Sequence, residues 1–394
     1  MSIKSFLMVF SSLSAGNDDP IRILVSAKHL YVMPAQTIDD LDTPSLIVDM
    51  DILERNQRRM MEFIRECHVN FRPHVKTHKV PEIAKIQLAA GAKGVCLQKL
   101  SEAEVFATHG ITDIFITNEV VGTHKYPRLA RLADQIDLKV AIDNYENAVE
   151  ISKACSEVGT ELKVFVDVDV GMHRCGVLPV EAGVLADKIS RLKNLVFTGI
   201  MGYDGHVSHG NSKSGQSEMA EEAMDQIAIA QKEIRKAGLE IQVTSVGSSV
   251  STWTDAKRPE VTEVQPGMYL FNAINLVEAG VATVDDCALT VLSTVMSKPA
   301  DDRAILDAGS KAFHFDHCKY PWLVGFEDAE IYGFSEEHAN VRLKGASRSL
   351  KVGDRVKGIP QHCCTCINQH NEMVALRKGK VENVWKVAAR GMMT

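Results

Sequence analysis

The residues Phe71-Arg72-Pro73-His74-Val75-Lys76-Thr77-His78-Lys79 combine basic and imidazole side chains with a short apolar lead-in. The pattern predicts a short strand at residues 70–75, and Pro81 is tolerated in the first turn of a helix that follows. Lys76 would then lie at the carboxyl end of a strand, directly before a helix. A lysine that is desolvated beside other cations has a lowered pKa, and its neutral amine can form a Schiff base. A solvated basic turn is the alternative interpretation.

Apolar segments rich in valine and isoleucine predict a series of buried parallel strands along most of the chain. They cover residues 45–49, 70–75, 93–97, 113–117, 138–142, 162–167, 195–202 and 242–246. Helical patterns lie between them, at residues 51–67, 81–90, 101–109, 145–158, 179–192 and 217–237. About eight β–α units over about 200 residues predict an α/β fold with a closed (β/α)₈ barrel of the TIM type. A doubly wound open sheet is the alternative.

After residue 285 the pattern changes to short strands separated by turns, which predicts a small β domain. These strands are expected at residues 288–295, 303–307, 329–333, 355–359, 373–377 and 381–387. The predicted division of the chain is an N-terminal extension at residues 1–41, the barrel at residues 42–285 and the β domain at residues 286–394. Residues 30–33 of the extension are a candidate strand for the β domain.

The composition limits the class of protein. The 394 residues carry a net charge of −7 without a cluster of one sign, which argues against nucleic acid as a partner. Most of the 9 cysteines are scattered singly in apolar runs, as in a reduced cytoplasmic protein. Residues 5–14 weakly resemble the core of a signal peptide, but serines interrupt them and no good cleavage site follows. We therefore expect a cytoplasmic protein with no membrane-spanning segment.

The predicted barrel places a set of polar residues on one rim. Active sites of TIM-type barrels lie at the carboxyl ends of the strands, and phosphate is usually bound after the last two strands. The residues at these ends are Lys76, Gln98, Asn118, Asp143, Arg174, Tyr203, His206, His209 and Gly247-Ser248-Ser249. A lysine opposite a Gly/Ser loop suits a phosphorylated aldehyde, because backbone N–H groups and hydroxyls can hold the phosphate. Most Gly-Ser-Ser runs are turns, and only the position after the predicted eighth strand favours a site.

The predicted β domain contains a candidate metal pair, His362 and Cys364, which flank Cys363. A histidine and a cysteine two positions apart can bind one ion if the strand bulges, and thiolate with imidazole suits Zn²⁺. Packed histidines and buried thiols are the commoner outcome of such a pair.

The segment Arg72 to Lys79 (RPHVKTHK) resembles the lysine motif of the D-threonine aldolase and D-serine dehydratase family, which belongs to the alanine-racemase-like, fold type III pyridoxal-phosphate enzymes. Similarity continues at residues 94–101 (GVCLQKLS), 117–122 (TNEVVG), 169–176, 291–299 (VLSTVMSKP) and 381–391. The resemblance thus covers residues 43–391, and it implies that Lys76, not Lys79, holds pyridoxal 5'-phosphate. It also implies a homodimer, because the family's active site is completed across a dimer.

The same resemblance assigns roles to other residues. Arg174 corresponds to the arginine beside the cofactor's ring hydroxyl, although an exposed, salt-bridged arginine is the alternative. Tyr203 corresponds to the position near the pyridine nitrogen, and Gly267 and Tyr269 to the second phosphate contact. A tyrosine would not keep that nitrogen protonated, which weakens the ring as an electron sink. The chemistry then needs help at the substrate's β-hydroxyl, and His362 with Cys364 would provide it through a metal ion.

The residues that decide the reaction give a mixed picture. The metal pair is His-x-Asp in the resembling aldolases and His-x-Cys in the dehydratases, and this chain has His-x-Cys. The run at residues 245–248 (SVGS) also resembles the dehydratases. Residues 203–209 (YDGHVSH) and the rim segments at residues 117–122 and 291–299 resemble the aldolases, whose base corresponds to His209, with His206 as the substitute.

We therefore expect a pyridoxal-phosphate and metal-dependent lyase for D-3-hydroxy amino acids. D-Threonine aldolase activity is favoured because His209 has a role in it, and dehydration of D-serine or D-threo-3-hydroxyaspartate is the alternative. Zn²⁺ is the favoured metal, with Mn²⁺ or Mg²⁺ as alternatives. A cofactor-carrier protein without catalysis is disfavoured by the extra β domain with its metal pair. A metallohydrolase is disfavoured because no His-x-His pair lies on an early strand.

Overall fold

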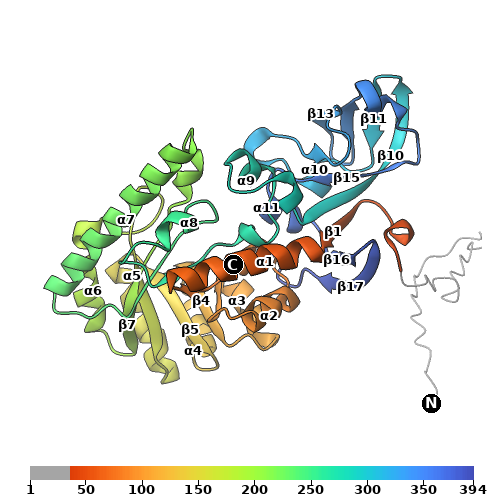
Figure 1. Cartoon of the computed structure of the whole chain (residues 1–394). Coiled ribbons are helices and arrows are strands. Elements are labelled where there is room, and N and C mark those ends of the chain that lie inside the picture. Colours follow the sequence, from red (N-terminus) through yellow and green to blue (C-terminus); the bar gives the residue numbers. More distant parts are fainter. Residues whose placement is uncertain (1–35) are drawn as a thin grey trace, which may run out of the picture. The chain divides into compact units, whose positions relative to one another are not determined.

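The computed structural model describes residues 36–394, and each structural statement below concerns this part of the chain. The candidate strand at residues 30–33 lies outside the described residues. An eight-stranded parallel sheet and a nine-stranded mixed sheet organise the fold. Figure 1 shows β4, β5 and β7 of the first sheet with helices α4 to α7, and β10, β11 and β13 of the second sheet grouped together. No helix in the described part is long and apolar enough to cross a membrane.

The parallel sheet has the strand order β2-β9-β8-β7-β6-β5-β4-β3. Its end strands are joined as well, because the Lys93 N–H donates to the Phe71 carbonyl (2.9 Å) and the Cys96 N–H donates to the Pro73 carbonyl (2.8 Å). The closed ring confirms the predicted (β/α)₈ barrel. The strands are β2 Asn70–Phe71, β3 Val95–Leu97, β4 Asp113–Glu119, β5 Asp137–Ile142, β6 Leu162–Asp167, β7 Leu195–Gly202, β8 Val243–Val246 and β9 Glu263–Val264.

Two short strands differ from the prediction. Ser45–Asp49 (β1), expected in the barrel, instead pairs antiparallel with β10 and parallel with β16 in the nine-stranded sheet. The barrel strand that was not predicted is β9, which has 2 residues and pairs with β2 and β8. So short a strand carries no periodic pattern, and a short apolar segment such as β1 fits either sheet. Consequently Gly247-Ser248-Ser249 follows the seventh strand of the ring, and Gly267 follows the eighth.

Helices follow the strands and pack on the outside of the ring (Figure 1). Their ends are set by polar caps, for example at Asp49, whose Oδ1 accepts from the Asp51 N–H (3.0 Å) before α1 begins. The α-helices up to residue 278 are α1 Met50–Cys67, α2 Pro81–Ala89, α3 Leu100–Thr108, α4 Tyr126–Ala133, α5 Tyr145–Val158, α6 Ala182–Ser190, α7 Lys213–Lys236, α8 Thr252–Asp255 and α9 Ile274–Glu278. The 3₁₀-helices η3 Val75–Thr77, η5 Gly205–His209 and η6 Met268–Leu270 lie at the carboxyl ends of strands.

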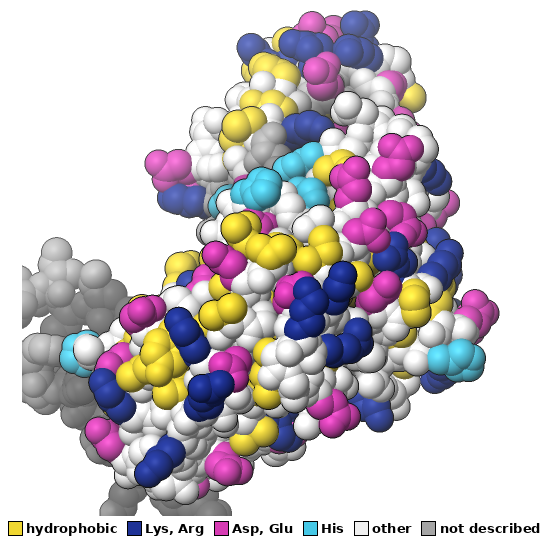
Figure 2. Space-filling view, turned by 90° about the vertical axis from the view of Figure 1, so that its left-hand side faces the viewer, with side chains coloured by type: hydrophobic (Ala, Val, Ile, Leu, Met, Phe, Trp, Pro, Cys, Tyr) yellow, Lys and Arg dark blue, Asp and Glu magenta, His cyan; other side chains and the backbone are white. Residues whose placement is uncertain are grey.

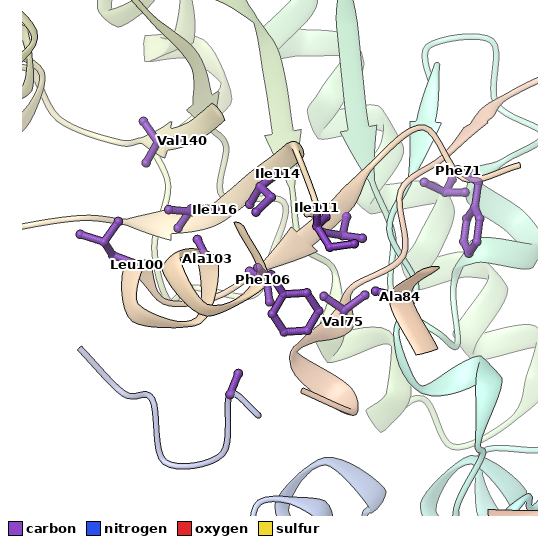
Figure 3. Close-up of a cluster of buried hydrophobic side chains, with 14 of the residues drawn as sticks. Phe71, Val75, Ala84, Leu100, Ala103, Phe106, Ile111, Ile114, Ile116 and Val140 are labelled. Atoms are coloured by element: carbon purple, nitrogen blue, oxygen red, sulfur yellow. The ribbon is translucent and has the colours of Figure 1, made fainter. Parts of the chain in front are cut away.

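Apolar side chains fill both the inside of the ring and the layer under the helices. Phe115 and Phe165 point inward with ring centroids 4.4 Å apart, so the barrel interior is a packed core and ligands must bind at its ends. Outside the ring, Figure 3 shows Phe106 of α3 beside Val75 of η3, with Ile114 of β4 nearby. Val75 is fully buried, and this packing fixes the short helix that carries the next residue, the predicted cofactor lysine.

Charged side chains form a buried network near the amino ends of β4 and β9. Arg72 Nε lies 3.0 Å from Glu263 Oε2, and Asp113 contacts both Arg72 and Lys139 at 2.5 Å. The Ser245 hydroxyl also donates to Glu263 (2.8 Å). The side chains of Arg72 and Glu263 are only 7% and 4% exposed, so Arg72 serves the barrel rather than a ligand.

The nine-stranded sheet has the order β13-β14-β11-β10-β1-β16-β17, with β15 beside β10 and β12 beside β15. Its strands after the barrel are β10 Leu289–Ala300, β11 Arg303–Leu306, β12 Trp322–Leu323, β13 Glu330–Phe334, β14 Ala339–Arg342, β15 Arg355–Ile359, β16 Glu372–Arg377 and β17 Lys380–Lys386. The short helices α10 Ser310–Phe313 and α11 Cys363–Ile367 lie in this part. It is the predicted strand-rich C-terminal part. The limits at residues 41 and 285 stay a prediction, and β1 adds residues 45–49 to this sheet.

The surface carries charges of both signs. On the face that Figure 2 shows, acidic and basic side chains lie interspersed among polar groups. Opposite charges that alternate in this way largely cancel each other's field at a distance.

Candidate active site

The basic residues of the segment at residues 71–79, which contains the predicted cofactor lysine, have different partners. His78 is buried, with Nε2 3.2 Å from Gln87 Oε1, and burial lowers the pKa of His78 to about 4. Lys79 forms an ion pair with Glu102 (3.2 Å) and donates to Asn368 Oδ1 (2.9 Å). Both residues therefore support the local structure rather than a ligand.

Lys76 is placed differently from its neighbours. It lies in η3, after the first strand of the barrel, and its Nζ donates to the neutral amide oxygen of Gln98 (3.3 Å). The same nitrogen lies 5.8 Å from the centre of the Tyr203 ring. Burial lowers the pKa of Lys76, and the positive charge of Arg174 lowers it further, while the Cys364 thiolate opposes them. A neutral amine is the form that reacts with an aldehyde.

The backbone beside Lys76 packs closely against the loop that contains Gly267. A Cβ atom on Gly267 would lie 2.6 Å from Thr77 Oγ1 and 2.7 Å from the His74 carbonyl oxygen, so only glycine fits there. His74 Nε2 is 2.9 Å from Thr117 Oγ1, whereas its buried Nδ1 has no hydrogen-bond partner in the described part. The glycine lets the loop after the last strand approach the lysine, which gives one ligand access to both.

Arg174 and Tyr203 meet at the same rim. The guanidinium carbon of Arg174 lies 5.0 Å from the centre of the Tyr203 ring, and Arg174 is exposed to solvent. Burial, and after it the Asp204 carboxylate, raise the pKa of Tyr203, so its phenol stays protonated. The structure thus brings Lys76, Gln98, Arg174 and Tyr203 together, although the order of the chain separates them.

The predicted phosphate loops are linked to each other. The Met268 N–H donates to Ser249 Oγ (2.9 Å), which ties the loop after the seventh strand to the loop after the eighth. Gly247 has φ +98°, a left-handed conformation that favours glycine. The Tyr269 hydroxyl donates to Gln57 Oε1 (2.6 Å) and also accepts a hydrogen bond from α2, so it is not directed at a ligand. A phosphate contact from Tyr269 would have to use its backbone.

The predicted metal pair lies at the start of α11. His362 is the residue before this helix and Cys364 lies in its first turn, so a helix end, and not the expected strand bulge, brings them together. His362 Nδ1 is 2.6 Å from Asp316 Oδ2. Burial lowers the pKa of His362, but the Cys364 thiolate and the Asp316 carboxylate raise it to about 10. A hydrogen bond from Cys363 and the charge of His362 hold the pKa of Cys364 well below its usual range.

A thiolate beside an imidazole is the donor set that a divalent ion such as Zn²⁺ prefers. Asp316 adds the carboxylate that commonly orients a metal-bound histidine through its other ring nitrogen. The sequence prediction did not include Asp316, which is 46 positions from His362. A single aspartate at that distance gives no recognisable spacing, so only the fold could identify it.

Lys76 and Cys364, one member of the predicted metal pair, line the same cavity. Its volume is about 420 Å³. It is lined by Lys76, Lys79, Gln98, Lys99, Glu102, His314, Cys364, Thr365, Asn368, Gln369, Met392 and Met393. The Cys364 thiol also lies 3.5 Å from Thr77 Oγ1, directly after the lysine. A small molecule in this cavity can reach both the Lys76 amine and the Cys364 sulfur.

The two candidate histidines lie in η5, directly after β7, the sixth strand of the ring. His206 packs against Gly171, where a Cβ would be 3.0 Å from its Nε2, and its buried Nδ1 has no hydrogen-bond partner in the described part. His209 is exposed. Within residues 36–394 His209 forms neither a hydrogen bond nor a ring contact with Lys76 or Cys364, so its role as a base stays a prediction.

Acidic groups occupy the rim between these residues. Glu119, Asp143 and Cys175 have ligand atoms within 4.8 Å of one another at the ends of β4 and β5 and in the loop after β6. Burial and the Glu119 carboxylate raise the pKa of Asp167 well above its usual range. Of the carboxylates only Asp143 was predicted at the rim. Within residues 36–394, the predicted Asn118 donates only to the Glu119 carbonyl (3.5 Å).

Comparison with known proteins agrees with this geometry. Residues 48–274 match the family model of the alanine racemase N-terminal domain, and residues 288–376 match that of a serine dehydratase domain. The chain is 37% identical to a D-threonine aldolase from Arthrobacter sp., over 91% of this chain and 96% of that protein. It is 34% identical to a 3-hydroxy-D-aspartate aldolase from Paracoccus denitrificans (strain Pd 1222), over 97% and 98%.

Solved structures show the same likeness. The D-threonine aldolase from Filomicrobium marinum superposes with a TM-score of 0.87 at 32% identity, over 91% of this chain and 99% of that one. A D-threo-3-hydroxyaspartate dehydratase variant in its metal-free form gives a TM-score of 0.83 at 28% identity, over 89% and 98%. The closed barrel with a rim lysine and a strand-rich C-terminal part is the architecture of an alanine-racemase-like enzyme.

Within that class, the chain belongs to the family of D-threonine aldolases and D-serine dehydratases, which are lyases. This confirms the family that the basic segment and the other motifs predicted.

Proposed function

We propose that this protein is a lyase that uses pyridoxal 5'-phosphate and a divalent metal ion to cleave D-3-hydroxy amino acids, with D-threonine giving glycine and acetaldehyde. The observation that supports it most is the cavity that Lys76 and Cys364 share. Cleavage between Cα and Cβ needs one group that takes up electrons from Cα and another that acts on the hydroxyl at Cβ. The cavity provides both on a scale that suits a small amino acid.

The residues on the rim fit the cofactor. Lys76, with its lowered pKa, would hold the aldehyde, and Arg174 and Tyr203 would lie beside the ring, with Gln98 next to the lysine. Gly267 leaves the close approach that a phosphate near the lysine requires. The phosphate would bind at Gly247-Ser248-Ser249 together with the backbone of Gly267 and Tyr269. When bound, pyridoxal phosphate supplies an electron sink for the bonding electrons released at Cα.

His362 and Cys364 would hold the metal, and their thiolate and imidazole favour Zn²⁺ over Mn²⁺ or Mg²⁺. The ion supplies positive charge next to the substrate's β-hydroxyl. In cleavage, His209, or His206 if the loop turns differently, would take the hydroxyl proton. In dehydration, Lys76 would take the proton from Cα, and the hydroxyl would leave as water.

Dehydration of D-serine or D-threo-3-hydroxyaspartate is the second candidate, because the metal pair is His-x-Cys as in the resembling dehydratases. A cofactor carrier without catalysis is the candidate from another class. A carrier needs only the groups that hold the cofactor, so the presence of Cys364 in the same cavity as Lys76 argues against it.

One incubation separates these proposals. The purified protein, supplied with pyridoxal phosphate and Zn²⁺, is given D-threonine, D-serine and D-threo-3-hydroxyaspartate in turn. We expect aldehyde and glycine from D-threonine, measured by a coupled alcohol dehydrogenase assay and by amino-acid chromatography. Keto acid and ammonia as the only products would establish the dehydratase, and no product from any substrate would favour the carrier.

A further inference from the structure

Two buried aspartates lie behind the proposed cofactor site. Asp204 directly follows Tyr203 at the end of β7, and Asp255 is the last residue of α8, after the loop that begins at Gly247. Both residues are 0% exposed. A Cβ on Gly247 would lie 3.1 Å from Asp255 Oδ2, so this carboxyl lies directly against the predicted phosphate loop.

No hydrogen-bond donor in the described part of the chain is bound to any of the four carboxyl oxygens. The Ser251 hydroxyl lies nearby and lowers the pKa of both groups, but it already accepts the Ser248 N–H (2.9 Å). The two carboxyls act on each other: the Asp204 charge raises the pKa of Asp255, and Asp255 lowers the pKa of Asp204. Two buried carboxylates with no cation between them cannot both stay charged.

We infer that Asp204 and Asp255 share one proton, and that this carboxyl pair positions Tyr203 and the Gly247 loop for the cofactor. The inference rests on the proposed function, because these two segments are the ones expected to hold the cofactor's ring and its phosphate. Through side chains, the pair links the segment after β7 to α8, the helix that follows the Gly247 loop. Both aspartates are positioning residues and touch no substrate.

The charges around the pair define its titration. Burial raises the pKa of Asp204 and raises that of Asp255 well above its usual range. His206, on the same turn as Asp204, lowers the pKa of Asp204, whereas Glu221 of α7 raises that of Asp255. Tyr203 is a neutral phenol. The proton is therefore held on Asp255 and directed at Asp204, and it is lost only when the pH exceeds the raised pKa of the pair.

The raised pKa of the pair makes both the stability of the fold and cofactor binding depend on pH. The unfolded chain loses the proton near an ordinary carboxyl pKa of about 4, whereas the folded chain keeps it to a higher pH. Stability therefore falls as the pH rises from about 4 to the raised pKa of the pair, because the folded state binds the extra proton. Above that pKa two like charges face each other, which separates Tyr203 from the Gly247 loop and weakens cofactor binding.

The test compares the wild type with Asp255→Asn, whose amide keeps the shape and the donor but cannot ionise. The dissociation constant of pyridoxal phosphate is measured by absorbance titration of the apoprotein at about pH 6 and about pH 9. We expect the wild-type constant to rise roughly tenfold more than that of the variant over this range, equivalent to one pKa unit. The melting temperature of the apoprotein should lose its dependence on alkaline pH in the variant. Asp225→Asn, an exposed carboxyl, is the matched control and should behave as the wild type.

Equal pH dependence of binding in the wild type and Asp255→Asn would overturn the inference. If Asp255→Asn does not fold, Asp204→Asn replaces it, since an amide at that position can donate to Asp255 and should flatten the pH dependence equally. Asp255→Ala removes the shared proton and should weaken cofactor binding at every pH. A wild type that does not bind pyridoxal phosphate at all would contradict the proposed function, whereas wild-type binding with an unchanged pH profile in the variants contradicts only the carboxyl pair.

Discussion

The environment of Lys76, more than its basicity, distinguishes it from the other cations nearby. Arg72 and Lys79 each lie beside a buried carboxylate, Glu263 and Glu102, that fixes their charge. Lys76 is half-buried, forms no ion pair within residues 36–394 and donates to the neutral amide of Gln98, so desolvation outweighs the opposing charge of Cys364 and its pKa falls. A sequence motif places these residues next to one another, but only the fold decides which of them receives a carboxylate.

Removing the amine tests this assignment. Lys76→Ala should abolish the visible absorbance of the protein with its cofactor and nearly all turnover, because the other amine of the segment, Lys79, is held in an ion pair with Glu102. Lys99→Ala, from the same cavity, is the control and should keep the absorbance. Borohydride reduction followed by peptide mass mapping should place the cofactor on Lys76. A label on Lys79, or on no lysine, would contradict the assignment of the whole rim.

The histidines of η5 separate cleavage from dehydration. A base must take the hydroxyl proton as the Cα–Cβ bond breaks, and such a base contributes roughly 10²–10⁴-fold. His209→Ala should therefore slow aldehyde formation from D-threonine by about that factor, while any keto-acid formation survives. His206→Ala is made in parallel, since this ring is half-buried and lies against Gly171. Full aldehyde production by both variants would mean that the base lies elsewhere.

The strands and helices could be predicted where a pattern repeats along the chain. Seven of the ring's strands and most helices were predicted from apolar runs, whereas β9, with 2 residues, was not. β1 was found as a strand but assigned to the wrong sheet, because its partners β10 and β16 come from the far end of the chain. Whether a segment forms a strand depends mainly on its local sequence, whereas the strands it pairs with depend on distant parts of the chain.

The buried network of β4 and β9 gives a stability prediction for the barrel. Arg72→Met should lower the free energy of unfolding by about 3–5 kcal/mol, because Glu263 is left buried without its partner. Arg72→Met combined with Glu263→Leu should recover part of this loss, while Asp113 keeps its pair with Lys139. Urea denaturation measures both. A loss by Arg72→Met no larger than that of the exposed control Arg131→Met would show that the network adds nothing.

The short helix α11 gives the prediction for the metal. Chelation should abolish activity but leave the visible absorbance largely intact, because the ion would act on the substrate's hydroxyl and not on the cofactor. Zn²⁺ should restore activity best, and Cys364→Asp should shift the preference toward Mn²⁺ or Mg²⁺, because carboxylate favours harder ions. Metal content is measured by mass spectrometry before and after chelation. Unchanged activity after confirmed removal of the metal would exclude its role.

At the scale of the molecule, the proposed site exists only because two distant parts of the chain meet. Cys364 and Thr77 are in contact although 287 positions separate them in the sequence. The sequence offered each half as a candidate, and the resemblance of its motifs, more than position or spacing, favoured Lys76 and the pair His362 and Cys364. It could not predict that α11 packs against η3 or that Asp316 contacts His362. Both contacts join parts of the chain that are far apart in the sequence, and only the tertiary structure brings them together.

Two of the predicted site residues, Arg174 and His209, are exposed in the single chain. An exposed base is well solvated, and catalysis by a solvated group gains little from the surrounding protein. We therefore predict that a second copy of the chain covers this rim in a homodimer. Sedimentation at a series of concentrations should give a dimer, and specific activity should fall on dilution with the same midpoint as dissociation. A monomer with full activity at every dilution would show that one chain holds the complete site.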